Sequence, residues 1–243
     1  MNNFGIIIFD IDGTLFDSMK LYTDTFCDIL QKVCDVPINE SQQVFLATSG
    51  LPLDDQFRLA IQKRTNIANF NINKLVGQFW EQVSQVDVAT MDNAVFVIRK
   101  LENAGYNLVA SSGSLPSVIR GRLNRVGLLE SFKLILGSDY RLGGIVKGDL
   151  HFVAIKDKFS LSYQDLRTNT IMIGDGSYDS ALAQRFGVMF IGYVKAGVVH
   201  DSKIRADIYI QDLLELIPLF SRVKHGTKYF LPIVKFLRIH RKD

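Results

Sequence analysis

The sequence predicts an α/β protein with a Rossmann-like, doubly wound parallel sheet and an inserted α-helical domain. Short, nearly continuous apolar runs recur along the chain and end in small or acidic residues. The segments between these runs carry apolar residues at helical spacing, which is typical of crossover helices between buried parallel strands. Nearly a hundred residues separate the first run from the second. One crossover needs far fewer, so an extra module is expected there.

Six apolar segments are the expected strands of this sheet. Each is apolar over most of its length, as a strand buried on both faces should be. They are Gly5–Phe9, Asn107–Ala110, Lys133–Leu136, Thr170–Ile173, Val188–Ile191 and Ile208–Ile210. Crossover helices are expected over 93–105 and 116–126, because each stretch ends at a glycine.

The long interval after the first strand is expected to form a helical cap domain over residues 17–91. Its apolar residues recur at helical spacing in two stretches: Tyr22, Phe26, Ile29 and Leu30, then Leu75, Phe79, Val83 and Val86. The α/β core would then consist of residues 1–16 and 92–220. Residues 221–243 would form a basic tail or an extra helix.

Composition and charge narrow the class of protein. With 47% hydrophobic and 22% charged residues, the chain has the composition of a soluble globular protein, and no apolar run approaches the ~20 residues that span a bilayer. We therefore expect a cytoplasmic protein.

Cys27 and Cys34 are expected to be buried thiols, because on one helix they would lie about 10 Å apart, too far for a disulfide.

The positive charge is concentrated in the tail. Between residues 221 and 243, seven basic residues accompany one acid, Asp243, so this segment carries +6. The net charge of the whole chain is +3, and the remainder therefore carries −3. Such a body gives no support for nucleic-acid binding, whereas the tail could contact an acidic membrane surface or a protein. An extra helix packed on the body is the simpler interpretation. The oligomeric state is not predicted.

Two carboxylates follow the first expected strand. Asp10 and Asp12 alternate, so they project to the same side, and Gly13 permits a sharp turn after them. Open α/β sheets bind ligands at the carboxyl ends of their strands. Adjacent acids at such a place repel each other and favour a bound cation, although aspartates also commonly cap turns.

Other strand ends carry complementary groups. Ser111 and Ser112 open a hydroxyl-rich turn suited to an anion, while Ser114 is expected to cap the following helix. Asp175 and Asp179 follow the fourth strand, and one helical turn between them would direct both carboxylates to one place. This density of oxygen ligands suits Mg²⁺.

Lys147 lies after the third strand and could supply a positive charge. Taken together, a carboxylate pair, a hydroxyl turn, a lysine and a second carboxylate pair are the groups that phosphoryl transfer needs. A lysine considered alone is more often a solvated surface residue.

The order of these motifs resembles the haloacid dehalogenase superfamily, in its phosphatase branch with a helical C1-type cap, and most of all its phosphoglycolate phosphatase-like members. The resemblance covers most of the chain, from about Phe4 to Phe220. It implies that Asp10 is the nucleophile, that Asp12 is the general acid and base, and that Ser111, Ser112 and Lys147 bind the phosphoryl group. It also implies that Mg²⁺ is bound by Asp10, Asp175 and the backbone oxygen of Asp12, with Asp179 supporting the site. The family lysine is commonly followed by proline, but Gly148 follows Lys147, so Lys156 and Lys158 remain alternatives.

The expected function is therefore a Mg²⁺-dependent phosphatase that hydrolyses a small phosphorylated metabolite through an aspartyl-phosphate. A cap loop of Gly50, Leu51, Pro52 and Leu53 is expected to face the substrate. A phosphomutase with the same chemistry is an alternative, although such mutases resembling this chain usually carry a histidine where Tyr22 stands and an arginine near Leu53. A non-catalytic binding protein of the same fold is a third possibility.

Overall fold

A computed structural model describes residues 5–62, 70–139, 145–195, 197 and 203–221. Its six strands form one parallel sheet in the order β3-β2-β1-β4-β5-β6, which confirms the predicted fold class. Their bounds are β1 (Ile6–Phe9), β2 (Asn107–Ser111), β3 (Phe132–Leu136), β4 (Thr170–Gly174), β5 (Met189–Tyr193) and β6 (Ile208–Ile210). Each lies within about two residues of its expected bounds.

The central strand β1 fixes the position of the candidate site. All four of its side chains are buried, so its apolar sequence is satisfied by both faces of the sheet. Ile6 pairs with Asn107 of β2 on one side and with Thr170 of β4 on the other. The three strands therefore run in register, and the residues that follow them emerge at the same edge of the sheet. The strand order reverses at β1, which is where open sheets of this kind bind ligands.

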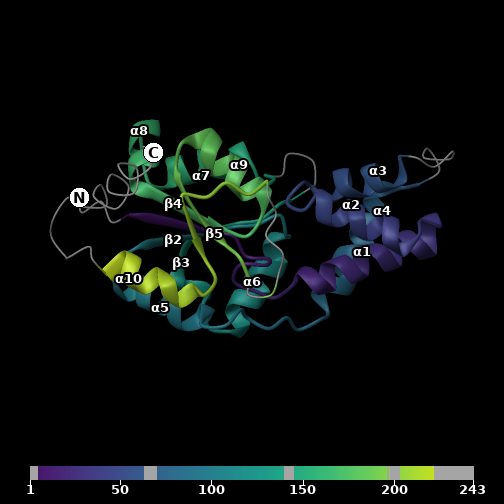
Figure 1. The fold of residues 1–243 in the computed structure, drawn as a ribbon, viewed down its shortest axis with the longest axis horizontal. Helices are drawn as coiled ribbons and strands as arrows, with labels where there is room; N and C mark the ends of the chain where they lie inside the picture. Colours follow the sequence, from purple (N-terminus) through teal and green to yellow (C-terminus); the bar gives the residue numbers. More distant parts are fainter. Residues whose placement is uncertain (1–4, 63–69, 140–144, 196, 198–202, 222–243) are drawn as a thin grey trace.

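Helices cover both faces of the sheet (Figure 1). On one face lie α5 (Ala94–Asn103), α6 (Pro116–Arg125) and α10 (Leu216–Ser221), and on the other lie α7 (Asp149–Lys158), α8 (Tyr163–Asn169) and α9 (Ser177–Phe186). Short 3-10 turns occur at Leu129–Ser131 and Leu213–Glu215. Two separate apolar clusters fill the spaces between these helices and the sheet.

Four helices between β1 and α5 form a separate layer at one end of the molecule, which we call the helical unit (Figure 1). They are α1 (Met19–Cys34), α2 (Ile38–Ala47), α3 (Leu53–Ile61) and α4 (Ile72–Ser84). The unit has its own apolar core, in which Phe26, Phe57 and Phe79 are at most 1% exposed. The predicted helical spacing holds except at Val86, which lies beyond the end of α4 and is 44% exposed.

Cys27 and Cys34 both lie on α1 and are free, buried thiols, as predicted. Within the described part of the chain, none of the helices combines the length and the apolar character needed to cross a membrane. The predicted basic tail falls outside the described residues from 222 onward.

The helical unit touches the α/β part through the loop between α2 and α3. Gly50 in this loop has φ of +92°, in the left-handed region that favours glycine. A Cβ atom at Gly50 would lie 2.5 Å from the Cβ of Tyr178, the second residue of α9. A side chain at position 50 is therefore opposed both by the backbone conformation and by the close approach of α9.

We predict that Gly50→Ala lowers the free energy of unfolding by about 1–3 kcal/mol, because alanine is strained at this φ and collides with Tyr178. The matched control is Gly77→Ala, since Gly77 is exposed on α4 with open space around it. That change should instead raise helix stability by about 0.5–1 kcal/mol. Urea denaturation followed by circular dichroism measures both. An equal effect of the two substitutions would contradict the close packing of Gly50.

Candidate active site

Asp10 and Asp12 lie where β1 ends, at the centre of the sheet. The backbone N–H of Asp10 donates to the carbonyl oxygen of Ile173 at 2.8 Å, so the pairing with β4 continues past the last strand residue. Gly13 then turns the chain with φ of +84°. The carboxylate of Asp175, which follows β4, packs against this glycine and leaves no room for a Cβ.

Lys147 meets two of the predicted carboxylates. Its Nζ lies 2.7 Å from Oδ1 of Asp10 and 2.7 Å from Oδ1 of Asp179. All three side chains are at most 6% exposed, so the ion pairs are shielded from water. Lys156, by contrast, pairs with its neighbour Asp157 on the surface of α7. Of these lysines, only Lys147 takes part in the carboxylate cluster.

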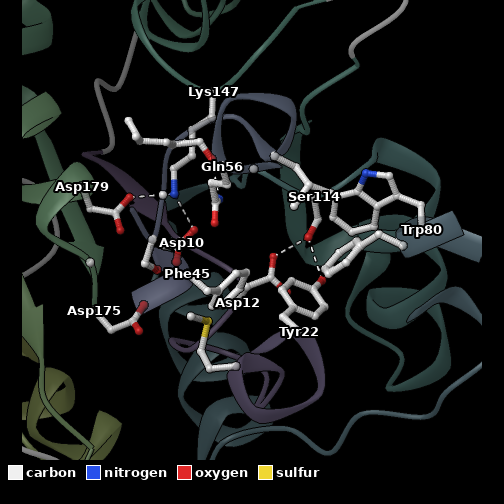
Figure 2. Close-up of a pocket in the computed structure, with 18 residues that line it drawn as sticks. Asp10, Asp12, Tyr22, Phe45, Gln56, Trp80, Ser114, Lys147, Asp175 and Asp179 are labelled. Atoms are coloured by element: carbon white, nitrogen blue, oxygen red, sulfur yellow. Dashed lines mark hydrogen bonds and ion pairs between the residues drawn. The ribbon is translucent and has the colours of Figure 1, made fainter. Parts of the chain in front are cut away.

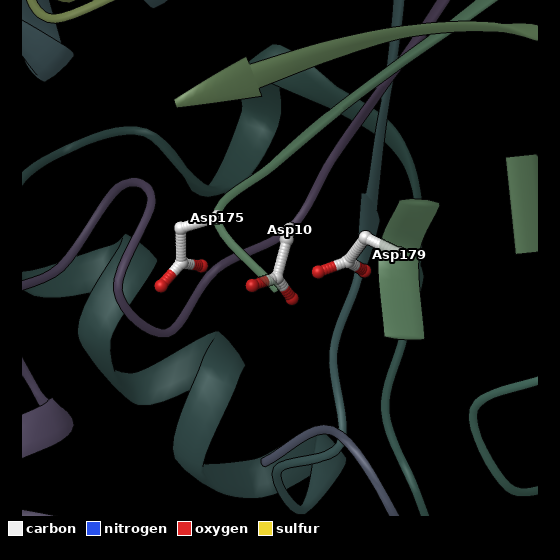
Figure 3. Close-up of side chains that lie close together, drawn as sticks. All are labelled: Asp10, Asp175 and Asp179. Atoms are coloured by element: carbon white, nitrogen blue, oxygen red, sulfur yellow. The ribbon is translucent and has the colours of Figure 1, made fainter. Parts of the chain in front are cut away.

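Asp10, Asp175 and Asp179 form a compact group of carboxylates (Figure 3). One oxygen from each lies within 4.8 Å of the others. Burial raises the pKa of Asp10 well above its ordinary value, and the negative charges of Asp179 and Asp175 raise it further against the opposing effect of Lys147. Burial and Asp179 also raise the pKa of Asp175, to about 7.

When ionised, the three carboxylates of this group carry more negative charge than the single ammonium of Lys147 balances. An ion with oxygen ligands would relieve the repulsion, and Mg²⁺ is the common choice for carboxylate sites of this kind. The donor set therefore fits a divalent cation. The side chain of Asp12 is not part of this group of three.

The carboxylate of Asp12 turns instead toward α6. Nη1 of Arg122 donates to its Oδ1 at 2.7 Å, and the hydroxyl of Ser18 donates to the same oxygen at 2.8 Å. Ser112 and Ser114 donate to Oδ2 at 2.7 and 2.6 Å. Burial by itself would raise the pKa of Asp12, but Arg122 and these hydroxyl groups outweigh burial and hold the pKa below its usual value.

Tyr22 of α1 links this second group to the helical unit. Its hydroxyl lies 2.7 Å from the hydroxyl of Ser114 (Figure 2). It also accepts a hydrogen bond from Nη1 of Arg122 at 2.9 Å. The prediction that Ser114 caps α6 was wrong. The N-cap is Leu115, which makes no side-chain cap, and the Ser114 hydroxyl is committed to Asp12.

Ser111 and Ser112 lie at the end of β2 as expected, but their hydroxyl groups are bonded within the protein. The Ser111 hydroxyl lies 2.8 Å from Nδ1 of His151. Nε2 of His151 lies 3.3 Å from the carbonyl oxygen of Gly137, which can only accept, so Nε2 carries the hydrogen and Ser111 donates to Nδ1. Burial and the charge of Lys147 lower the pKa of His151 to about 4, so this imidazole is neutral at pH 7.

A pocket of about 80 Å³ opens beside the carboxylates, between the sheet edge and the helical unit. Asp10, Asp12, Lys147, Asp175 and Asp179 line one side (Figure 2). Gly50, Leu51 and Leu53 of the predicted cap loop line it as well, whereas Pro52 precedes α3 and is not among the lining residues. Ser111 and Ser112 do not line it either; Gly113 and Ser114 do.

The residues whose contacts with the predicted site were missed by sequence reasoning include Tyr22, Ser114, Arg122 and His151. The apolar spacing of α1 predicted that Tyr22 is a core residue, and its ring is indeed buried. The spacing did not predict the hydrogen bonds of its hydroxyl group. Arg122 lies on a helix with two other arginines, Arg120 and Arg125. Only its position on the inward face of α6, with 4% exposure, distinguishes it.

Comparison with known proteins identifies the family of this chain. The family model for haloacid dehalogenase-like hydrolases matches residues 7–193, which include all the predicted catalytic and metal-binding residues. The chain belongs to the haloacid dehalogenase-like hydrolases. The resemblance inferred from the sequence is thereby confirmed. A relative from Dickeya dadantii, described as "Probable phosphatase IndB", is 27% identical over 190 residues, which make up 77% of this chain and 80% of the relative.

Solved structures of this hydrolase family share the fold. A protein from Haemophilus somnus, described as a predicted phosphoglycolate phosphatase, superposes with a TM-score of 0.70 at 19% sequence identity. The superposition covers 90% of this chain and 99% of the Haemophilus chain. CbbY from Rhodobacter sphaeroides, solved with xylulose-(1,5)bisphosphate, gives a TM-score of 0.72 at 15% identity and covers 88% and 96%. At these identities the comparison establishes the architecture.

We predict that Arg122→Met lowers the free energy of unfolding by about 3–5 kcal/mol, because the Asp12 carboxylate then stays buried without its cationic partner. Adding Asp12→Asn should recover part of the loss. The matched control on the same helix is Arg125→Met, since Arg125 pairs with Asp87 at the surface. Its effect should stay within about 1 kcal/mol. Similar losses for both arginines in urea denaturation would contradict the buried pairing.

Proposed function

We propose that this hydrolase is a Mg²⁺-dependent phosphatase that cleaves a small phosphomonoester through an aspartyl-phosphate on Asp10. The observation that carries the proposal is the position of the Asp10 carboxylate, which is held 2.7 Å from the buried Lys147 ammonium and within one cluster with Asp175 and Asp179. A buried carboxylate at a strand end beside a cation is a suitable nucleophile.

Asp10 must be ionised to attack phosphorus. Lys147 favours the ionised form, and the pKa of Lys147 is itself raised because its interactions with Asp10 and Asp179 outweigh its burial. The same ammonium is placed to contact a phosphoryl oxygen during attack. Asp179 then acts by orienting Lys147, to which it is bound at 2.7 Å.

Asp10 and Asp175 would hold Mg²⁺, together with the backbone oxygen of Asp12. The bound ion would supply positive charge to the phosphoryl oxygens and favour the ionised forms of both carboxylates. Thr14 donates to Oδ1 of Asp175 at 2.9 Å and so fixes the orientation of this ligand.

Asp12 is proposed as the general acid and base. In the described arrangement it is bound by one guanidinium and three hydroxyl groups, so it is ionised and a weak base. To give a proton to the leaving oxygen and to take one from water, Asp12 must exchange some of these donors for the substrate or water. Ser114 belongs to the turn after β2, whereas Tyr22 lies on α1 of the helical unit. Movement of the helical unit would therefore change the donors around Asp12.

The phosphoryl group is proposed to bind Lys147 and the turn at Ser111 and Ser112. For Ser111 to donate to phosphate, its hydroxyl must turn away from His151. Both ring nitrogens of His151 are bonded within the protein, Nδ1 to Ser111 and Nε2 to the carbonyl oxygen of Gly137. We therefore assign His151 the role of positioning Ser111 when the site is empty. We infer that the helical unit is the cap of the enzyme and that Gly50, Leu51 and Leu53 contact the substrate. The name of the Dickeya relative, a phosphatase, supports the reaction class.

The direct test measures phosphate release from a panel of phosphomonoesters with Mg²⁺ and with EDTA, beside Asp10→Asn. We expect release with Mg²⁺, its loss with EDTA, and a decrease of about three orders of magnitude or more in kcat for Asp10→Asn, because the amide cannot form the acyl-phosphate. Activity retained by Asp10→Asn would refute the nucleophile. Isomerisation of the ester without phosphate release would identify a phosphomutase instead.

Binding of Mg²⁺ should weaken as the pH falls below about 7. The pKa of Asp175 is about 7 in the absence of an ion, so below that pH a proton must leave before the carboxylate can bind metal. The apparent dissociation constant is expected to rise about tenfold per pH unit. Calorimetric titration in buffers of different ionisation enthalpy measures both the affinity and the released proton. An affinity that is independent of pH from about 5 to 7 would contradict this account.

A further inference from the structure

The wall of the pocket that faces the carboxylates is apolar and comes from the helical unit. Its apolar side chains lie on α1, on α2, on the loop before α3, at the start of α3, and on α4. They are Met19, Tyr22, Phe45, Leu51, Leu53, Phe79 and Trp80. Tyr22, Phe79 and Trp80 pack edge to face with centroid distances of 5.0–5.9 Å, so this part of the wall is a rigid aromatic surface.

The polar groups of this wall are few and largely engaged. Nε2 of Gln56 donates to the carbonyl oxygen of Leu51 at 2.8 Å, and its Oε1 accepts from Thr48 at 3.4 Å. The hydroxyl of Tyr22 is bonded to Ser114 and Arg122. The other polar groups that the helical unit contributes are the Ser49 side chain and the indole N–H of Trp80, which is buried and makes no hydrogen bond among the described residues.

Positive charge is confined to the phosphoryl side. Among the described residues that line the pocket, the basic side chain is Lys147, and it is bound to Asp10 and Asp179. A leaving group with a carboxylate would therefore lose water without gaining a cation, and one with several hydroxyl groups would lose hydrogen bonds. The pocket volume of about 80 Å³ is also well below the ~300–1,000 Å³ of pockets for larger ligands, which favours a compact organic group, and the helical unit must move outward to admit a ring beside the phosphoryl group.

We propose that the preferred substrates are phosphate monoesters of a compact, uncharged, apolar alcohol, such as one that carries a single aromatic ring. The inference rests on the proposed phosphatase function and specifies its substrate class. The ester phosphorus lies at Asp10 and Lys147, and the organic group lies against Phe45, Phe79 and Trp80. Asp10 forms a bond to phosphorus as the P–O bond to the alcohol breaks, and the alcohol oxygen takes a proton from Asp12 in its protonated form. Water then cleaves the aspartyl-phosphate, and its proton returns to Asp12.

Three esters with alkyl oxygen leaving groups test the preference, because their intrinsic reactivities are similar. They are benzyl phosphate, phosphoglycolate and glycerol 1-phosphate. With Mg²⁺, kcat/KM for benzyl phosphate should exceed that for each of the other two by about tenfold or more, since burial of the ring favours its transition state. Equal or faster turnover of phosphoglycolate or glycerol 1-phosphate would overturn the inference and leave the phosphatase function intact.

A binding measurement decides the matter without turnover. Trp80 is the single tryptophan of the chain, so its fluorescence reports directly on the aromatic wall. Titration of the Mg²⁺-loaded protein with 2-phenylethylphosphonate should quench or shift this emission at a concentration about tenfold lower than 3-phosphonopropionate requires. The same order of affinities in a protein that releases no phosphate from any ester would support the apolar ligand preference of this wall but refute the phosphatase function on which the substrate assignment rests. Equal or tighter binding of the carboxylate compound would overturn the inference.

A substitution at Met19 tests the role of charge. Met19 is partly exposed and lines the pocket, and lysine has a similar unbranched side chain. Met19→Lys should lower kcat/KM for benzyl phosphate and raise it for phosphoglycolate about tenfold relative to the control Met19→Gln, which is polar without charge. A gain for phosphoglycolate of the same size in both variants would show that charge does not exclude the carboxylate.

Discussion

Three carboxylates held together with a single buried ammonium are the constraint on which the site depends. The parallel pairing of β1 with β4 aligns the ends of the two strands, and Asp10 and Asp175 follow them directly. Asp179 joins them because α9 begins immediately afterwards. The backbone of a buried sheet cannot relax to separate these charges, and burial together with the charge of Asp179 raises the pKa values of Asp10 and Asp175. A divalent cation would remove that repulsion, and its binding would therefore stabilise the folded protein.

A second charge pair lies beside the first and is balanced separately. Arg122 neutralises Asp12, and the pKa of Asp12 is lowered although the residue is only two positions from Asp10. Two carboxylates with pKa values displaced in opposite directions are suited to different tasks in one reaction. The separation arises from topology, since Asp10 faces Lys147 and α9 while Asp12 faces α6 and α1.

The sequence predicted the sheet and the helices well because both depend on local apolar patterns. Each strand is a short apolar run that is buried on both faces. Because burial on both faces requires apolar residues throughout, the run predicts the bounds of the strand to within about two residues. The positions of Asp10 and Asp175 were equally predictable, since each directly follows a strand. Arg122, Tyr22 and His151 were not predictable for a different reason. Each lies within a helix whose pattern explains it as core or surface, and its polar contact depends on how that helix packs. Ser114 shows the same limit, because the common role of a serine before a helix was replaced by a stronger bond to an ionised carboxylate.

The helical unit must exclude water during the first half of the proposed reaction and admit it during the second. An apolar wall cannot hold a water molecule firmly, because such a site offers too few hydrogen-bond partners. While the ester is bound, the organic group would fill the space against Phe45 and Trp80, and bulk water would be displaced from phosphorus. Departure of the alcohol would open that space beside Asp12, whose bonded hydroxyl groups provide the polar partners that a water needs. Water would therefore enter only after the leaving group has departed. The hydrogen bond between Tyr22 and Ser114 would keep this space small, so that few water molecules enter.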